Sequence, residues 1–400
     1  MIYLKLVFTV NRYKPSLDGV QFVTSYLAEG LAAKGHEVVV ITSRYTRVPS
    51  SEKEEISGVK VVRKKMTTVH TFHRGNKKDY QKFILEETKN ADCLINIGSQ
   101  SPFTDWCFKV LDDIKIPKLL YLHSIWNFKM NRNDFINLKR LSFKLWANIR
   151  WYIYYCTNKK TFKKYDTVIQ LHEKDESYDF FLKRYGITSR IIENAADNCF
   201  FEKKVNTNFK KPFENYLIYV ANYIDGKNQI LAIREFLKSN IDKKVGLVLI
   251  GSIKNNYYNY LVKEEKKLRK KLNLSKNEKP IIMLTNVDRN LISSYVSNSL
   301  IYLLSSKEEK FPVSIIESMA ASVPFISTDV GIVKYLPGGV VSNQEDISYW
   351  IEKLYYDDEL RSDLGRIGNK YASKHMRIKD KVDQLEKIIL DLTGGEVNDK

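Results

Sequence analysis

The chain has 400 residues, of which 44% are hydrophobic, 12% aromatic and 28% charged, and its formal net charge is +18 at pH 7. This composition excludes a largely disordered chain, and the length is sufficient for two domains. The opening MIYLKLVFTV is too short to span a membrane and is not followed by a cleavage site of small residues, so we interpret it as a first strand.

The cysteines and acidic residues argue against a metal site. No Cys-x-x-Cys pair occurs among the four cysteines, which disfavours both a zinc site and a disulfide framework. There is also no Asp-x-Asp pair of the kind that holds a metal on a diphosphate. We therefore expect a cytoplasmic protein with no bound metal.

Short apolar, β-branched segments alternate with helical patterns along the whole chain. In chain order these segments are residues 4–10, 36–43, 59–65, 93–98, 118–123, 166–172, 189–194, 217–222, 245–251, 280–285, 299–305 and 324–329. Strands that alternate with helices form parallel sheets with helices on both faces. So many strands exceed one open sheet, and the sequence therefore predicts two.

The lysine-rich, polar segment 202–215 is the natural boundary between these two sheets. The sequence predicts an α/β protein of two Rossmann-like, doubly wound domains that face each other across a cleft. The N-terminal domain spans residues 1–205 and the C-terminal domain residues 206–375. A C-terminal helix and tail, residues 376–400, can pack back on the N-terminal domain. Because ligands bind beyond the carboxyl ends of parallel strands, functional residues are expected at strand ends.

The stretch EEKFPVSIIESMAAS, residues 308–322, has Glu309 and Glu317 at the two ends of a mostly apolar segment. Its apolar positions predict the buried side of a helix with Pro312 in the first turn, so Glu309 precedes the helix and Glu317 lies about one and a half turns into it. The amides of residues 313–315 would then point outward at the positive end of the helix dipole. The stretch is therefore a candidate phosphate-binding socket.

Three other strand ends carry candidate residues. The loop that ends in Asp18 and Gly19 precedes a helix and either delivers backbone amides to the cleft or is an ordinary turn. Lys227 lies in a strand-to-helix loop, where it either reaches a phosphate or is solvated. His123 ends its strand and so faces the cleft, whereas most lone histidines are packed and hydrogen-bonded.

Taken together, these features resemble the retaining glycosyltransferases of family 4 (glycosyl transferases group 1), which have the GT-B fold. The resemblance covers nearly the whole chain, through IIENAADNCFF at 191–201 to TDVGIVKYLPGGVV at 328–341, and is weakest between residues 50 and 190. It implies a metal-independent, hexosyltransferase-type enzyme with no cofactor. Such an enzyme moves a sugar from a nucleotide-diphosphate donor, which we expect to be UDP-linked, to a glycan or lipid-linked acceptor of cell-surface polysaccharide synthesis.

The resemblance also assigns roles to individual residues. It implies that Glu317 binds the nucleotide ribose, that Glu309 contacts the donor sugar, and that Lys227 meets the diphosphate. His123, Glu309 and Lys227 are the predicted catalytic residues. The predicted donor-binding residues are Gly19, Asn222, Lys227, Glu309, Lys310, Phe311, Val313, Ser314 and Glu317.

Three positions depart from the family pattern. Asn222 stands where an arginine is usual, Lys310 replaces a glycine, and Asp18 replaces the first glycine of a pair. Asn222 calls the usual diphosphate contact at this position into question, and Lys310 either supplies the missing charge or is solvated. The departures leave open a catalytically silent, glycosyltransferase-like accessory subunit.

Residues 128–164 hold ten basic side chains and one acidic one, so half of the net charge lies there. Leu138, Leu141, Leu145, Ile149 and Ile153 form a helical stripe within this segment. The stripe predicts either a core face beside solvated lysines or an interfacial helix on an anionic leaflet. The corresponding membrane or acceptor candidates are Lys139, Arg140, Lys144, Trp146, Arg150 and Trp151.

The partners expected are therefore a sugar nucleotide, a glycan or lipid-linked acceptor, and an anionic membrane surface if the stripe is interfacial. The last partner would place the protein on the inner face of the cell membrane. The charge also suggests nucleic acid, but no recognition-helix or RNA-platform motif accompanies it, so no specific nucleic-acid partner is expected. The sequence does not indicate an oligomeric state.

Overall fold

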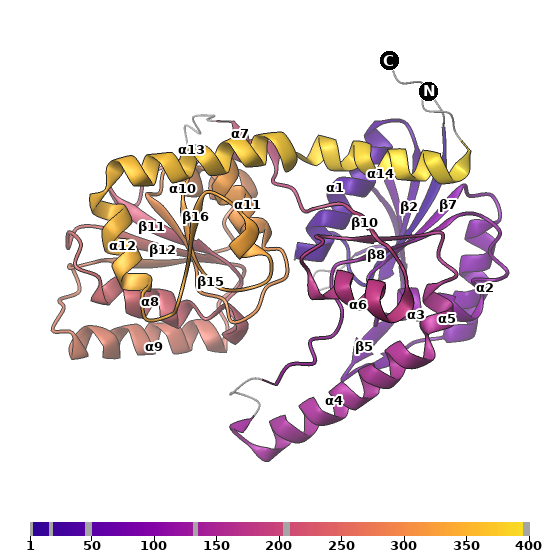
Figure 1. Cartoon of the computed structure of the whole chain (residues 1–400), viewed down its shortest axis with the longest axis horizontal. Coiled ribbons are helices and arrows are strands. Elements are labelled where there is room, and N and C mark those ends of the chain that lie inside the picture. Colours follow the sequence, from indigo (N-terminus) through magenta and orange to yellow (C-terminus); the bar gives the residue numbers. More distant parts are fainter. Residues whose placement is uncertain (1–2, 16–18, 45–49, 131–134, 203–208, 395–400) are drawn as a thin grey trace. The chain divides into compact units, whose positions relative to one another are not determined.

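The computed structural model describes residues 3–15, 19–44, 50–130, 135–202 and 209–394 (Figure 1). The chain folds into two compact units. Unit 1 comprises Met1–Glu193 together with Lys381–Lys400, and unit 2 comprises Asn194–Asp380. Each unit is built around one sheet with helices on both of its faces, as the alternating pattern predicts.

Unit 1 has an eight-stranded sheet with the order β10-β9-β8-β7-β1-β2-β4-β3. Every neighbouring pair is parallel except β3 and β4. The central strands are buried along nearly their whole length, which explains their continuous apolar runs. The strands are β1 (Lys5–Thr9), β2 (Glu37–Ser43), β3 (Lys53–Ile56), β4 (Val59–Lys64), β7 (Cys93–Ile97), β8 (Lys118–Leu122), β9 (Thr167–Gln170) and β10 (Arg190–Ile191).

The helices and one hairpin complete unit 1. The hairpin consists of β5 (Thr67–Val69) and β6 (Phe72–Arg74) and forms a sheet of its own. The helices are α1 (Gly19–Ala33), α2 (Lys77–Thr88), α3 (Pro102–Asp105), η1 (Cys107–Lys109), α4 (Leu138–Thr157), α5 (Lys159–Phe162), α6 (Glu176–Tyr185) and α14 (Ile378–Thr393), the last of which belongs to unit 1 from Lys381 onward.

Unit 2 has a six-stranded, all-parallel sheet with the order β13-β12-β11-β14-β15-β16. Its strands are β11 (Tyr216–Val220), β12 (Gly246–Gly251), β13 (Ile281–Thr285), β14 (Ile301–Leu304), β15 (Phe325–Thr328) and β16 (Gly339–Ser342). Its helices are α7 (Asn198–Phe201), η3 (Asp225–Lys227), α8 (Gln229–Lys238), α9 (Asn256–Lys271), α10 (Arg289–Ser297), α11 (Val313–Ala320), η4 (Val333–Tyr335), α12 (Ile347–Tyr356) and α13 (Asp358–His375). Counted from β11, the strand order is 3-2-1-4-5-6, the Rossmann order, which reverses between β11 and β14.

The C-terminal helix α14 packs on unit 1. His36 Nε2 lies 2.9 Å from Glu386 Oε1, and Lys34 forms ion pairs with Glu386 and Asp383. A Cβ on Gly30 would lie 2.4 Å from a methyl group of Val382, so only glycine allows α1 and α14 to approach this closely.

All twelve predicted strands are present, but the predicted boundaries differ from the division of the chain. The chain divides after Glu193 and after Asp380, rather than at residues 205 and 375. Part of the predicted boundary segment, residues 203–208, lies outside the described residues. The sequence did not predict β3, the β5–β6 hairpin or β16, which are short or rich in polar residues.

Candidate active site

The predicted residues of unit 2 lie where the strand order reverses. Lys227 follows β11 and Glu309 follows β14, two neighbouring strands of the sheet. The backbones of the two loops are joined, because Lys307 N donates to Gly226 O over 2.9 Å and Ser305 Oγ donates to Asn228 O over 2.9 Å. In open parallel sheets this reversal is the usual place for a ligand.

Lys227 and Glu309 form a direct ion pair across these loops. Lys227 Nζ lies 2.6 Å from Glu309 Oε1, and Ser306 Oγ donates to the same oxygen over 2.7 Å. The Lys227 side chain is 27% exposed and the Glu309 side chain 12% exposed, so both are accessible to a ligand. Tyr219 OH donates to Lys227 O over 2.6 Å and fixes the lysine backbone. The sequence predicted both residues for the site but not their contact.

Glu317 is paired with a base that the sequence did not indicate. Its side chain is only 4% exposed, and Oε1 contacts Nη2 of Arg289 at the start of α10. Burial raises the pKa of Glu317, whereas the charge and hydrogen bond of Arg289 lower it. Arg289 lies 28 residues earlier in the chain, on another helix, so no sequence spacing connects it with Glu317.

The start of α11 differs from the prediction in two details. Pro312 is the N-cap, one residue before the helix, and is not part of the first turn. Ile315 N donates to Pro312 O over 3.2 Å, so the prediction that its amide points outward is wrong. The cap has no side-chain hydrogen bond, and the amides of Val313 and Ser314 are therefore the remaining phosphate donors. Both residues are half-buried.

The backbone between the two glutamates is held by neighbouring segments. Gly331 has φ +55°, and a Cβ there would lie 2.2 Å from Lys310 O, so only glycine fits. Ile332 N donates to Lys310 O over 3.1 Å, and Asn194 Nδ2 donates to Phe311 O over 2.8 Å. Asn222, at the position of the usual arginine, accepts a hydrogen bond from Gln229 Nε2 at its carbonyl oxygen over 2.9 Å. These contacts place Lys310, Phe311 and Asn222 in the loops around the ion pair.

The two remaining predicted residues belong to unit 1. Gly19 is the first residue of α1, and a Cβ there would meet nothing within 4 Å, so crowding does not require a glycine. Asp18 lies outside the described residues. His123 directly follows β8 and stacks on Tyr121, with ring centroids 4.9 Å apart. Within the described part of the chain, its buried Nε2 has no hydrogen-bond partner.

Burial lowers the pKa of His123 to about 4, so we expect a neutral imidazole throughout the physiological range. In the unfolded chain, His123 has the ordinary histidine pKa of about 6.5 and therefore binds its proton more tightly than in the folded protein. The contribution of neutral His123 to the free energy of unfolding is thus complete above pH ~6.5 and is lost as the pH falls through ~4. An NMR titration of the imidazole, assigned with His123→Gln, checks this expectation. A midpoint near the ordinary histidine value would contradict it.

Comparison with known families agrees with this geometry. The model described as "Glycosyltransferase Family 4" matches residues 17–197, and the model described as "Glycosyl transferases group 1" matches residues 200–371. The chain belongs to glycosyltransferase family 4. The two matches together extend over both units.

Two solved structures illustrate the fold that this family 4 protein shares with other proteins. Sucrose-phosphate synthase from Thermosynechococcus elongatus superposes with a TM-score of 0.74 at 15% identity, over 98% of this chain and 100% of that chain. WaaG, a glycosyltransferase involved in lipopolysaccharide biosynthesis, superposes with a TM-score of 0.67 at 17% identity, over 98% and 100%. These similarities confirm the predicted GT-B fold of two parallel-sheet α/β domains.

Two curated relatives match about half of the chain. "Uncharacterized glycosyltransferase MJ1178" of Methanocaldococcus jannaschii is 26% identical over 231 residues, which are 50% of this chain and 64% of that protein. N-acetyl-alpha-D-glucosaminyl L-malate synthase of Bacillus anthracis is 24% identical over 224 residues, 52% of this chain and 55% of that protein. The matched part therefore spans less than two thirds of either relative.

The basic segment of this family 4 protein presents an apolar surface. Figure 1 shows α4 beside β5, away from the main sheet of unit 1. Of the two alternatives for the stripe, the core face is wrong, because Leu138 is 83% exposed and Ile149 62% exposed, and Leu145 and Ile153 are also exposed. The buried side of α4 consists instead of Ala147, Trp151 and Tyr155. Trp151 is therefore not a surface residue, contrary to the prediction.

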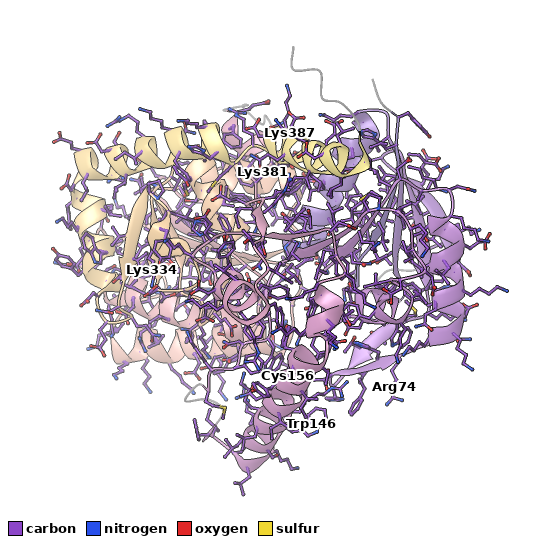
Figure 2. All side chains as sticks on the ribbon, turned by 45° about the vertical axis from the view of Figure 1, so that its right-hand side comes forward. Arg74, Trp146, Cys156, Lys334, Lys381 and Lys387 are labelled. Carbon is purple, nitrogen blue, oxygen red and sulfur yellow. The ribbon has the colours of Figure 1, made fainter. Side chains whose placement is uncertain are left out.

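The β5–β6 hairpin extends this surface. Phe72 is exposed, and its ring centroid lies 5.5 Å from that of Trp146. The guanidinium carbon of Arg150 lies 4.6 Å from the centroid of the Phe72 ring. Figure 2 labels Trp146 on the helix and Arg74 on the hairpin. Arg150 Nη2 also donates to Thr71 O over 2.9 Å and so ties helix and hairpin together. We call these exposed apolar residues the α4 ridge: Val69, Phe72, Phe135, Ile136, Leu138, Phe143, Leu145, Trp146, Ile149, Tyr152 and Ile153.

Basic side chains border the α4 ridge. Lys139 and Arg140 are exposed at the start of the helix, and Lys144 Nζ donates to Asn127 O over 2.6 Å and lies over the Trp126 ring. In the ranges that the structure describes, no helix is long and apolar enough to cross a membrane. The surface therefore combines an apolar helix face with positive charge at its edges.

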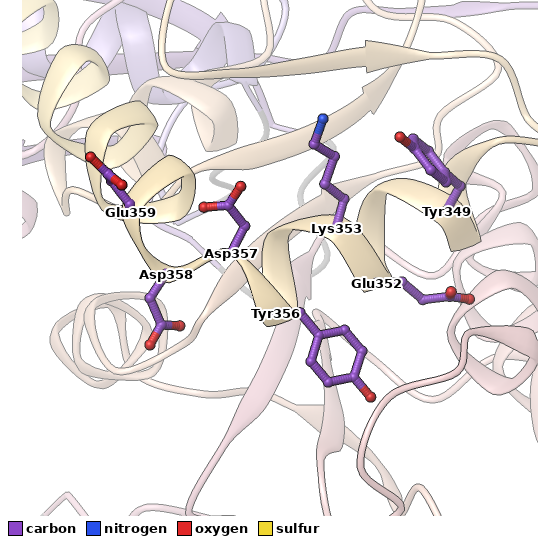
Figure 3. A pocket seen from close by; sticks show the side chains of 7 residues that line it. All are labelled: Tyr349, Glu352, Lys353, Tyr356, Asp357, Asp358 and Glu359. Carbon is purple, nitrogen blue, oxygen red and sulfur yellow. The ribbon is translucent and has the colours of Figure 1, made fainter.

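A surface pocket lies on α12 and the start of α13 in unit 2 (Figure 3). It is lined by Tyr349, Glu352, Lys353, Tyr356, Asp357, Asp358 and Glu359. Four carboxylates against one lysine would repel an anionic ligand such as a diphosphate. The strand ends at Lys227 and Glu309 are therefore the better candidate for an anionic donor.

Proposed function

We propose that the protein is a retaining, metal-independent glycosyltransferase that uses a nucleotide-diphosphate sugar and a lipid-linked glycan acceptor. The observation that carries this proposal is the pairing of two glutamates with two bases beside the start of α11, at the strand reversal of unit 2. Membership of family 4 supports the class of reaction.

The donor is held by groups with different tasks. The free oxygen of Glu317 accepts from ribose hydroxyls, and such charge-assisted bonds contribute about 1.5 to 3 kcal/mol each. The amides of Val313 and Ser314 bind a phosphate at the positive end of the α11 dipole. Lys227, which Glu309 holds in place, supplies a positive charge to the diphosphate. A UDP donor is favoured because HepE of Anabaena, solved with UDP, has a TM-score of 0.66 to this chain at 13% identity.

Transfer with retention requires attack on the face that the phosphate leaves. The bond from the anomeric carbon to the phosphate oxygen breaks, and the acceptor oxygen bonds to that carbon on the same face. The acceptor proton moves to the departing phosphate oxygen. The charge that grows on the phosphate is stabilised by Lys227 and the α11 amides, which are fixed before the reaction begins. Within the described part of the chain, no three His, Cys, Asp or Glu side chains are grouped to hold a metal.

The acceptor is inferred from the α4 ridge. An apolar helix face bordered by bases fits the interface of an anionic membrane, where each base contributes about 1 kcal/mol. A protein attached to the cytoplasmic membrane face in this way would meet acceptors that are anchored in the same leaflet. The lipid-linked glycan is therefore favoured over a freely diffusing sugar.

Calorimetric titration of the full chain with UDP-, GDP- and TDP-sugars, in the presence of EDTA, tests the donor assignment. We expect one nucleotide class to bind with EDTA present, and NMR of the transferred sugar to show the same anomeric configuration as the donor. Binding that requires Mg²⁺ would contradict metal independence. No binding with or without Mg²⁺ would contradict the proposed enzyme and favour an accessory subunit.

A further inference from the structure

We infer that Arg289 is a positioning residue of the donor site, which orients Glu317 and keeps it negatively charged for the nucleotide. The inference rests on the proposed function, because it concerns the same donor site. Arg289 follows strand β13, whose carboxyl end lies at the same edge of the sheet as the ends of β11 and β14.

The geometry leaves one carboxylate oxygen of Glu317, Oε2, for a ligand. Arg289 Nη2 contacts Oε1, and no hydrogen bond to Oε2 is found among the described residues. The guanidinium itself is supported, since its Cζ lies 5.2 Å from the Phe200 ring of α7. A guanidinium held by a ring and a carboxylate has few conformations, so it fixes the Glu317 rotamer and aims Oε2 in one direction.

The charges around Glu317 make this base necessary. Asp197, at the start of α7, repels Glu317 and attracts Arg289, and Cys199 of the same helix also faces Arg289. Tyr302 of β14 faces both Glu317 and Glu309. The positive charge of Lys227 is neutralised by its ion pair with Glu309 and so does not balance the charge of Glu317. Arg289 is therefore the base that balances the Glu317 charge within the described part of the chain.

This balance matters because the donor is an anion. The two carboxylates would repel a diphosphate, but each has its own base, Lys227 on Glu309 and Arg289 on Glu317. Burial and the charge of Asp197 both raise the pKa of Glu317, and Arg289 opposes them, so without Arg289 this pKa would rise further. A protonated Glu317 offers one acceptor oxygen fewer to the ribose, so donor binding would then require a higher pH.

The test is calorimetric titration of the full chain with UDP between pH 6 and 9, for the wild type, Arg289→Gln and Arg289→Lys. We expect wild-type affinity to be nearly constant, and Arg289→Gln to bind about thirtyfold or more weakly at pH 6.5 and to recover as the pH rises. Arg289→Lys keeps the charge and should restore both the affinity to within about tenfold and the flat profile. Arg234→Gln is the matched control, because Arg234 pairs with Glu235, a buried glutamate of α8, over 2.7 Å.

The outcomes separate this inference from the proposed function. If the wild type binds no UDP, the proposed function fails before Arg289 is tested. If the wild type binds and Arg289→Gln matches it at every pH, the inference is wrong. If Arg289→Gln and Arg289→Lys lose the same affinity with flat pH profiles, Arg289 contacts the nucleotide itself, which also overturns the positioning role. Thermal melting identifies any variant that is unfolded. If Arg289→Gln is unfolded, the affinity and the pH profile of Arg289→Lys test the inference.

Discussion

Lys227→Ala is expected to lower kcat/KM for sugar transfer by about 10²- to 10³-fold, the range found when one charge-stabilising group is removed from an active site. Lys227 is the basic residue in the loop that follows β11. Its Nζ is held 2.6 Å from Glu309 Oε1. Its removal takes a positive charge from the departing diphosphate and leaves the Glu309 carboxylate without its ion-pair partner. Most of the loss should appear in kcat, because the charge on the phosphate grows in the transition state.

The matched control is Lys307→Ala. Lys307 lies in the loop after β14, has a similarly exposed side chain and forms an ion pair with Asp225 over 2.7 Å. Its pair lies at the exposed edge of the same two loops, so its loss should change kcat/KM by less than about tenfold. Steady-state kinetics with the donor identified by calorimetry gives both values. Equal losses in the two variants would show that loop stability, rather than the charge of Lys227, is responsible.

Most of the twelve predicted strands could be found because buried parallel strands leave continuous apolar runs, whereas β4 alternates between buried and exposed residues. The edge strand β3, with the sequence KEEI, is half-exposed and polar, so it has no such run. The two strands of the β5–β6 hairpin have three residues each, too few for a periodic pattern. The predicted boundary at residue 205 was placed by composition, whereas the actual division after Glu193 follows contacts that composition does not report.

The candidate site was predicted in part. Glu309 and Glu317 could be found because a strand end and the start of a helix leave clear sequence signals, whereas Lys227 was singled out only by the family resemblance. The contact of Lys227 with Glu309 exists because β11 and β14 are neighbours in the sheet. Local sequence patterns do not predict which strands are neighbours. The contact of Arg289 with Glu317 depends further on how α10 and α11 are rotated against each other. Only the weak signal of a base just after a strand could have suggested Arg289.

The helix α4 shows a different limit. Its apolar period was read correctly, but both sides of the helix carry apolar residues, and periodicity alone cannot tell which side is buried. The structure buries the side with Ala147 and Trp151 and exposes the side with Leu145 and Ile149. The exposed side is thus the one that a membrane would contact.

Leu145→Glu combined with Ile149→Glu is expected to reduce binding to anionic vesicles by about a hundredfold or more. Burying one such side chain contributes about 1.5 to 3 kcal/mol, and two of them correspond to at least two orders of magnitude. Both residues are exposed in the folded chain, so the substitutions should leave its melting temperature unchanged. Co-sedimentation with vesicles of phosphatidylcholine and phosphatidylglycerol, compared with phosphatidylcholine alone, measures the effect.

Leu182→Glu combined with Ile367→Glu is the control, because it adds the same charges at exposed apolar residues outside the α4 ridge. This control should bind vesicles like the wild type, apart from the effect of two added negative charges. Lys139→Glu combined with Arg140→Glu should instead abolish the preference for phosphatidylglycerol while it retains the apolar contact. If the ridge and control variants bind equally well, the apolar face does not contact the bilayer. A lipid-linked acceptor would then have to reach the site without help from α4, and the inference that the acceptor shares the membrane with the protein would lose its structural basis.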